Sequence, residues 1–260
     1  MFFNFEKKFD IDKDKLNKPI VLIGWPGIAY VAKLAISSIK DSIEANLFSS
    51  IKYFDFPAKS TVENGSLEIP SAEVYYKPRK KNDIFILTAN FQPQSSEGVF
   101  EFSKKFCEVM DEITNGKIVM YVSTGALATR EIDGEPKVHI SSTDEELLDS
   151  FLKFENITTM DKGIIAGANG ILPAWAGKMG FAPGACLLAE TVPIPVMEVD
   201  PKASKALVTI IRDYFEIDID FSELDKKIEE MQSMFESFKQ QAEHFMKGGK
   251  DEGGPDSYFR

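Results

Sequence analysis

Side chains of the types used in catalysis stand near the expected ends of buried strands. Ser123 and Thr124 follow an apolar run, Asn169 lies in a glycine-rich stretch, and Glu190 ends another apolar segment. In α/β proteins, ligands bind in the crevice outside the strand ends. These residues are therefore the candidates for an enzyme active site, although their positions along the chain give no convergent geometry.

The small number of histidines and the absence of the common catalytic motifs argue against metal or cofactor chemistry. His139 and His244 are the 2 histidines of the chain, which excludes a histidine-rich metal site. Val138-His139-Ile140 is typical of a strand that turns the imidazole away from its apolar neighbours, so a structural role is favoured. The patterns G-x-x-x-x-G-K-[ST], H-E-x-x-H and G-x-S-x-G are absent from the sequence. We expect no cofactor and no bound metal.

Two glycine-rich segments are candidates for phosphate-binding loops. Gly24-Trp25-Pro26-Gly27 follows an apolar strand and opens a helix, which is the right place for an anion site. The spacing is not G-x-G-x-x-G, and a tight strand-to-helix turn is the favoured interpretation. In the segment 163–170, glycines and alanines allow close packing of the backbone.

The charge balance excludes one class of partner. The chain has 260 residues, with 30 Lys and Arg against 41 Asp and Glu, and a formal net charge of −11. A sequence-independent nucleic-acid binder needs a basic surface that displaces counterions, so no nucleic-acid partner is expected. Apolar residues at 43% and charged residues at 27% are ordinary for a globular protein. Cys107 and Cys186 lie among apolar neighbours and are expected to be buried.

Export and membrane insertion are not expected. Residues 1–15 begin apolar and then become charged, the reverse of a signal peptide. The longest uncharged stretch, Gly163–Gly177, contains Asn169 and Pro173 and is shorter than the roughly 20 apolar residues that cross a bilayer. We expect a cytoplasmic protein with no membrane contact.

The candidate residues must be positioned by alternating strands and helices over residues 1–220. The expected strands are Ile20–Gly24, Ile51–Phe56, Leu67–Tyr76 (one strand, or two with a bend at Pro70), Asp83–Ala89, Lys117–Ser123, Gly163–Leu172 and Ala185–Ala189. The expected helices cover 28–40, begin at Ser95 or Ser96 and end at Gly116, and begin at a Thr143 capping box and at Asp200-Pro201. This alternation predicts an α/β domain with a largely parallel sheet flanked by helices.

Residues 221–247 form a different kind of segment. Apolar residues recur there at alternating intervals of four and three over about three heptads, the pattern of a coiled-coil-like helix. The positions are Leu224, Ile228, Met231, Phe235, Phe238, Ala242 and Phe245. Such a helix packs on its own domain or serves as an oligomerisation helix or arm, and the strict heptad favours the second interpretation.

The last segment, residues 248–260, has a composition of its own. Glycines and a proline make it a flexible linker. It ends in Tyr258-Phe259-Arg260, and a purely solvating tail has no physical use for adjacent aromatic residues. A short recognition motif on a disordered tail is one interpretation of this ending.

Three segments resemble the archaeal and bacterial proteasome-assembly-chaperone family. The strand-turn-helix of Val21 to Leu34 is similar to its opening motif, with Ala29 and Ala32 where the family often has glycine. The segments Ile165–Leu172 and Gly184–Thr191 are similar to two further motifs. The resemblance covers about residues 18–245, and it implies a fold similar to that of nucleoside phosphorylases.

The resemblance also implies a function and a partner. Some archaeal members of this family form homo-oligomers, and their tails end in a hydrophobic-Tyr-X tripeptide that docks between α subunits of the proteasome core particle. The matching positions here are Tyr258, Phe259 and Arg260, with Phe259 where tyrosine is usual. The implied function is a non-enzymatic assembly chaperone or ATP-independent activator. The alternative is a phosphorylase- or nucleosidase-like enzyme, or a ligand-binding regulator, that uses the crevice residues.

Overall fold

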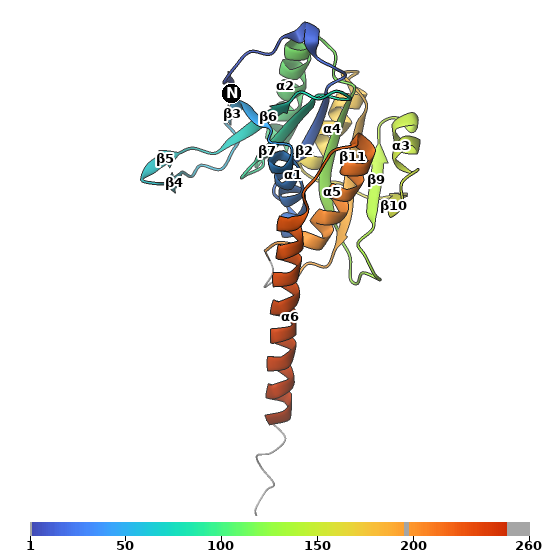
Figure 1. Ribbon diagram of the computed structural model, residues 1–260. Coiled ribbons are helices and arrows are strands. Elements are labelled where there is room, and N and C mark those ends of the chain that lie inside the picture. The colour runs from blue at the N-terminus through green and yellow to red at the C-terminus, as the bar shows by residue number, and fades with distance from the viewer. Residues whose placement is uncertain (1, 195–197, 249–260) are drawn as a thin grey trace, which may run out of the picture. The chain divides into compact units, whose positions relative to one another are not determined.

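The computed structural model describes residues 2–194 and 198–248 (Figure 1). Contacts between Cα atoms divide the chain into two units, Met1–Asp220 and Phe221–Arg260. The first unit is an α/β domain. The second contains the helix α6 (Ser222–Gly248).

A nine-stranded sheet forms the centre of the first unit, in the order β1-β3-β6-β7-β2-β8-β11-β9-β10. The strands are β1 (Phe3–Lys7), β2 (Ile20–Gly24), β3 (Asn46–Tyr53), β6 (Ser71–Lys77), β7 (Ile84–Ala89), β8 (Met120–Ala128), β9 (Val138–Ser142), β10 (Ile157–Thr159) and β11 (Gly184–Thr191). The neighbours β7, β2, β8 and β11 are parallel. On either side of them, β6 and β9 join in antiparallel pairs. The predicted α/β class is confirmed. Four parallel strands form the centre of the sheet, and β9 and β10 at one edge are also parallel.

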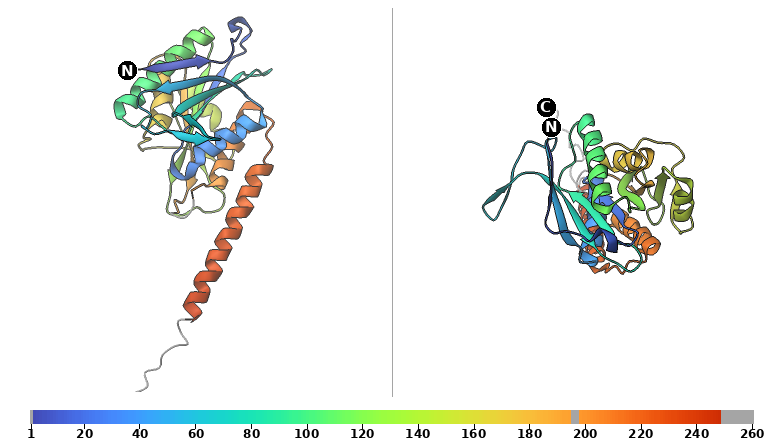
Figure 2. Two further views of the ribbon diagram at one scale, coloured as in Figure 1. Left: turned by 90° about the vertical axis from the view of Figure 1, so that its left-hand side faces the viewer. Right: turned by 90° about the horizontal axis from the view of Figure 1, so that it is seen from above.

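Helices cover both faces of this sheet (Figure 2). On one face α1 (Val31–Ser42) packs beside α5 (Pro201–Phe215), and on the other α2 (Ser96–Thr114) packs beside α4 (Ala168–Lys178). The short α3 (Glu145–Phe151) contacts β9. A sheet covered on both faces requires apolar residues throughout its central strands. Every residue of β2 and of β7 is accordingly buried.

The helices follow their apolar periodicity and caps. In α2 the predicted Ser95 cap is confirmed, since its side chain accepts from the backbone N–H of Gly98. The Asp200 cap before Pro201 is confirmed in the same way by a bond from Ala203. Both thiols, Cys107 and Cys186, are buried and unpaired, as expected.

The prediction of a strand over Gly163–Leu172 is wrong. Residues 163–167 have no regular structure, and α4 begins at Ala168 after Gly167, whose φ of +75° is left-handed. Small and apolar residues in a short run do not distinguish a buried strand from a buried helix. Gly170 allows the helix to start close to the preceding loop, because a Cβ there would collide with the Ile165 backbone.

Other observed boundaries differ from the predicted ones by a few residues. The second expected strand runs over Asn46–Tyr53 instead of Ile51–Phe56, and β8 begins at Met120. The cap of α3 is Asp144, because Thr143 uses its hydroxyl to bond Gly184. Leu67–Tyr76 is two strands, β5 (Ser66–Glu68) and β6, with Pro70 between them. β5 pairs with β4 (Thr61–Glu63) in a separate hairpin.

Candidate functional site

The structure brings three of the predicted crevice residues together. Ser123 and Thr124 lie on the central strand β8, and Asn169 lies in the first turn of α4. Ser123 and Thr124 are fully buried, and Asn169 is 8% exposed. Their hydrogen-bond partners decide whether these groups are free to act on a ligand.

The Ser123 hydroxyl supplies a hydrogen bond that the helix α4 cannot make within itself. Proline has no N–H, so Pro173 inside α4 leaves the carbonyl of Asn169, four residues earlier, without its helical donor. The Ser123 hydroxyl donates to that carbonyl at 2.5 Å. The Asn169 side chain in turn accepts from the backbone N–H of Trp25 at 3.3 Å. These bonds tie α4 to β8 and to the turn after β2.

Replacing Ser123 with alanine should therefore destabilise the fold. The Asn169 carbonyl would be left buried without a donor, a loss of about 1–3 kcal/mol in the free energy of unfolding. Urea unfolding measures this loss. In the double variant Ser123→Ala/Pro173→Ala, a backbone N–H returns at residue 173, so the two losses should be less than additive. Strictly additive losses would contradict this role of Ser123.

Two threonines hold the end of β2 from either side. Thr124 donates to the carbonyl of Ile23 and Thr88 to that of Gly24, both at 2.9 Å. At Gly24 itself an added Cβ would meet Ile36 and, at 2.7 Å, the carbonyl of Ala32. Gly24 is thus required by a close contact between β2 and α1, which the sequence-based interpretation of a tight strand-to-helix turn did not include.

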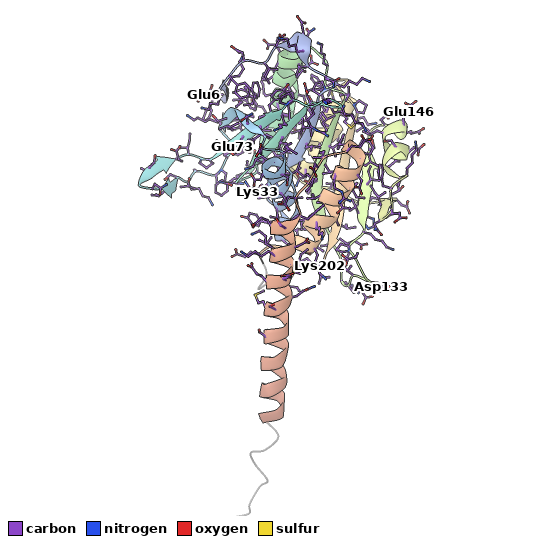
Figure 3. The ribbon with its side chains drawn as sticks, in the orientation of Figure 1. Glu6, Lys33, Glu73, Asp133, Glu146 and Lys202 are labelled. Carbon is purple, nitrogen blue, oxygen red and sulfur yellow. The ribbon has the colours of Figure 1, made fainter. Side chains whose placement is uncertain are left out.

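Lys33 and Gln92 also bond backbone groups at the carboxyl ends of β7 and β2. Sequence patterns alone did not single them out. The Lys33 ammonium donates to the carbonyl of Ala89 at 2.6 Å and to Asn90 Oδ1 at 2.7 Å. Burial lowers the pKa of Lys33, opposed by the charge of Glu73 (both labelled in Figure 3). Gln92 bridges two segments, because it donates to the Pro26 carbonyl and accepts from the Ala168 N–H. Each of these polar groups holds backbone in place.

Glu190 belongs to a different group. It lies on β11 and accepts from the backbone N–H of Lys137, while His139 Nε2 of β9 lies 2.9 Å from its carboxylate. Burial raises the pKa of Glu190, and the bonds from His139 and Lys137 outweigh burial, so the net pKa is lowered. His139 therefore contacts a carboxylate on the neighbouring strand, a partner that the sequence did not predict. Glu190 is therefore not part of the group formed by Ser123, Thr124 and Asn169.

The turn after β2 is strained. Ala29 and Tyr30 have φ of +45° and +47°, left-handed values that cost a non-glycine residue of order 1 kcal/mol each. Hydrogen bonds hold them, from the Tyr30 N–H to Gly27 O and from the Asp200 N–H to Ala29 O. This backbone explains why glycine suits the position of Ala29. The turn leaves Ile28 and Tyr30 46% and 45% exposed.

Among those side chains of residues 2–194 and 198–248 that the structure describes, no cluster of three or more from His, Cys, Asp or Glu could ligate a metal ion. Within the same ranges, no helix combines the length and the apolar character that crossing a bilayer requires.

The remaining predicted residues lie in the second unit. Leu224, Ile228, Met231, Phe235, Phe238 and Phe245 belong to α6, a continuous helix. The side chains of Phe235, Phe238 and Phe245 lie outside the described part. Tyr258, Phe259 and Arg260 also lie outside the described residues.

Comparison with known proteins identifies the family. The profile of the PAC2 family matches residues 21–239, which span the turn after β2, both helical layers and much of α6. The chain belongs to the PAC2 family. Uncharacterized protein MJ1210 of Methanocaldococcus jannaschii is 27% identical over 240 residues, which are 92% of this chain and 90% of the relative.

Solved structures of two Pyrococcus furiosus proteins share the PAC2-family fold. PbaB, described as an archaeal proteasome activator, is 25% identical with a TM-score of 0.81, over 91% of this chain and 98% of PbaB. PbaA, described as an archaeal homolog of proteasome-assembly chaperone, is 18% identical with a TM-score of 0.73, over 95% of this chain and 96% of PbaA. The resemblance noted in the sequence is confirmed.

Proposed function

We propose that this protein is a non-enzymatic proteasome assembly chaperone or ATP-independent activator that acts in the cytoplasm. The observation that carries the proposal is the likeness to PbaB, an archaeal proteasome activator, over 91% of the chain. The contacts of the crevice residues Ser123, Thr124 and Asn169 also favour a protein without catalytic activity. Their buried hydroxyls and amide hold backbone groups, so they are poor candidates for a nucleophile or an acid–base pair.

The proposed partner is the α ring of the proteasome core particle, reached by the C-terminal tail. A terminal carboxylate on Arg260 pairs with a lysine of a cleft, while the ring of Tyr258 buries apolar area beside it. Phe259 lacks the hydroxyl of the usual tyrosine. If the cleft bonds that hydroxyl, its absence costs about 1 kcal/mol, which is roughly a fivefold weakening for each tail.

Self-association through α6 would compensate for a weak tail. Several tails on one oligomer engage the ring at a high effective concentration, and the glycine-rich linker gives them reach. The proposed contact between copies is the heptad stripe, here called the seam: Leu224, Ile228, Met231, Phe235, Phe238, Ala242 and Phe245.

Co-purification with the core particle of the same organism tests the function and the tail together. The full-length chain should bind, and deletion of residues 258–260 should abolish binding while the circular dichroism spectrum stays unchanged. Deletion of residues 251–253 is the matched control, because it shortens the linker equally and keeps the terminal tripeptide. Binding by the 258–260 deletion would overturn the tail mechanism.

Failure of the full-length chain to bind would overturn the proteasome proposal itself. The crevice would then become the leading site, and a thermal-shift screen with nucleosides and inorganic phosphate would test the enzyme and ligand-binding alternatives. A stabilising shift there would support a phosphorylase-like or regulatory function.

A further inference from the structure

The strand β1 forms one edge of the nine-stranded sheet. Within the part of the chain that the structure describes, it pairs with β3 alone. It is the dark-blue arrow beside the mark N in the left view of Figure 2. An edge strand carries a row of backbone N–H and C=O groups that its own sheet does not use. Such a row is a template on which a further strand can pair.

The pairing of β1 with β3 shows which backbone groups of β1 point outward. At one end of the pair, the Lys8 N–H donates to the Phe48 carbonyl at 2.8 Å. At the other end, the Phe54 N–H donates to the Phe2 carbonyl at 3.2 Å. Hydrogen-bonded and non-bonded pairs alternate along an antiparallel ladder, so the even-numbered residues of β1 direct their backbone groups toward β3. The residues whose backbone N–H and C=O groups point away from the sheet are Phe3, Phe5 and Lys7.

The aromatic rings at this edge are incompletely covered. Phe3 and Phe5 pack against the core between α2 and the sheet, yet both remain partly exposed. The ring centroid of Phe3 lies 5.4 Å from that of Phe102. The ring centroid of Phe5 lies 6.0 Å from that of Phe48. A strand added beside β1 would extend the cover over both rings and would bond the outward backbone groups.

The residues of β1 suit pairing with the same strand of a second copy. A two-fold axis at Phe5 would bring all three outward residues into hydrogen-bonded pairs, because Phe3 then lies opposite Lys7. On the other face of the strand pair, Asn4 would lie opposite Glu6. Each charged side chain thus faces an uncharged one, so this register opposes no like charges.

The neighbouring registers are less favourable. An axis at Asn4 would pair Phe3 with Phe5 and leave Lys7 opposite a position beyond the end of β1. An axis at Glu6 would place this carboxylate opposite its own copy, and an axis at Lys7 would do the same to the ammonium. Like charges directly opposite each other destabilise a strand pair. The charges of β1 therefore favour a single register.

We infer that β1 of one copy pairs antiparallel with β1 of a second copy about a two-fold axis at Phe5, which joins the two sheets edge to edge. Both copies use the same surface, so the contact closes at two copies and does not continue into a filament. Two strands of 5 residues bury less than the roughly 1,200 Å² of a standard interface, so association through this contact alone is weak. The contact depends neither on proteasome binding nor on the seam of α6.

Disulfide trapping in the full chain tests this contact and its register, because a covalent bond captures weak association. Asn4 and Glu6 are exposed. Residues opposite each other in a non-hydrogen-bonded antiparallel pair have Cα atoms about 4.5 Å apart, a separation that a disulfide spans. Under mild oxidation, a mixture of Asn4→Cys and Glu6→Cys chains should form a dimer in which position 4 is linked to position 6. Cys107 and Cys186 are buried, and the parent chain treated in the same way gives the background.

Each single variant alone is the matched control for the mixture. In the proposed register, position 4 of one copy lies diagonally from position 4 of the other, about 7–8 Å away, and the same holds for position 6. A disulfide does not span that separation without backbone movement, so each variant alone should give at least a tenfold lower yield. An equal or higher yield from either variant alone would place the axis elsewhere and overturn the inference. A mixture that yields no more dimer than the parent chain would overturn it too.

A backbone variant separates strand pairing from chance proximity. Lys7→Pro removes an outward N–H and no bond to β3, and proline is tolerated at such positions of an edge strand. It should lower the yield of the disulfide between positions 4 and 6 at least tenfold, while the circular dichroism spectrum and the unfolding midpoint verify the fold. Lys7→Ala loses the same contact with Asp10 but keeps the N–H, so it should retain the yield. An unchanged yield with Lys7→Pro, or an equal loss with Lys7→Ala, would contradict pairing through the backbone.

Discussion

Replacing Phe102 with alanine should lower the free energy of unfolding by about 3–5 kcal/mol. Phe102 is fully buried on the inner face of α2. Its ring centroid lies 5.1 Å from Trp25, 5.3 Å from Tyr53 and 5.4 Å from Phe3. Truncation removes one ring contact from each of these three residues. It also leaves a cavity, because the close-packed interior around it cannot shift to fill the space. Equilibrium unfolding in urea measures the loss.

Phe100→Ala is the matched control for that measurement. Phe100 lies two residues earlier on the same helix and is 46% exposed, with a single ring contact to Trp175. Its loss should be about 1 kcal/mol. Equal losses in the free energy of unfolding at the two positions would show that the aromatic cluster around Phe102 is not the centre of the core between α2 and the sheet. Trp25 is held by the same cluster, so Phe102 also supports the turn after β2.

The parallel centre of the sheet was predictable because its strands are apolar at every position. Ile20–Gly24 was predicted with its final bounds, and the strand over residues 83–89 begins one residue later than predicted. The helices α2 and α5 followed from their apolar spacing and their Ser95 and Asp200 caps. In these segments local propensity and tertiary burial favour the same structure, which is what makes a sequence informative.

The glycine-rich segment before α4 was not predictable in that way. Residues 163–172 are small and apolar, and such a run suits a buried strand or a buried helix equally well. Pro173 argues against a helix interior, yet Ser123, fifty residues earlier in the chain, supplies the missing hydrogen bond. A tertiary contact thus overrode the local signal, and nothing near residue 173 in the sequence announces it.

The same contact explains the outcome at the candidate site. The sequence placed Ser123, Thr124 and Asn169 near strand ends, and the structure does bring them together. Their residue types suit catalysis and backbone support alike, and only the partner atoms separate these roles. The hairpin of β4 and β5 shows the opposite case, because Asn64-Gly65 between alternating apolar residues is a strong hairpin signal. Treating Leu67–Tyr76 as one or two strands of the main sheet hid it.

If copies associate as proposed, replacing Phe238 with aspartate should reduce the proposed oligomer to a species of 29.1 kDa, the mass of one chain. The reason lies in the proposed seam, where apolar residues recur every three or four positions along α6. A carboxylate at a seam position would be buried without a partner, and the cost of removing it from water exceeds what one coiled-coil position contributes. Multi-angle light scattering of the full chain measures the mass.

Ser237→Asp is the control, because it adds the same charge one residue earlier, at an exposed position of α6. That variant should keep the mass of the parent. An unaltered mass for Phe238→Asp would show that the seam is used within one chain. Loss of the oligomer should also weaken core-particle binding while each tail stays intact, since the effective concentration of linked tails disappears. Because Phe238→Asp leaves residues 258–260 untouched, weaker binding would be due to valency, which the tail deletion alone cannot show.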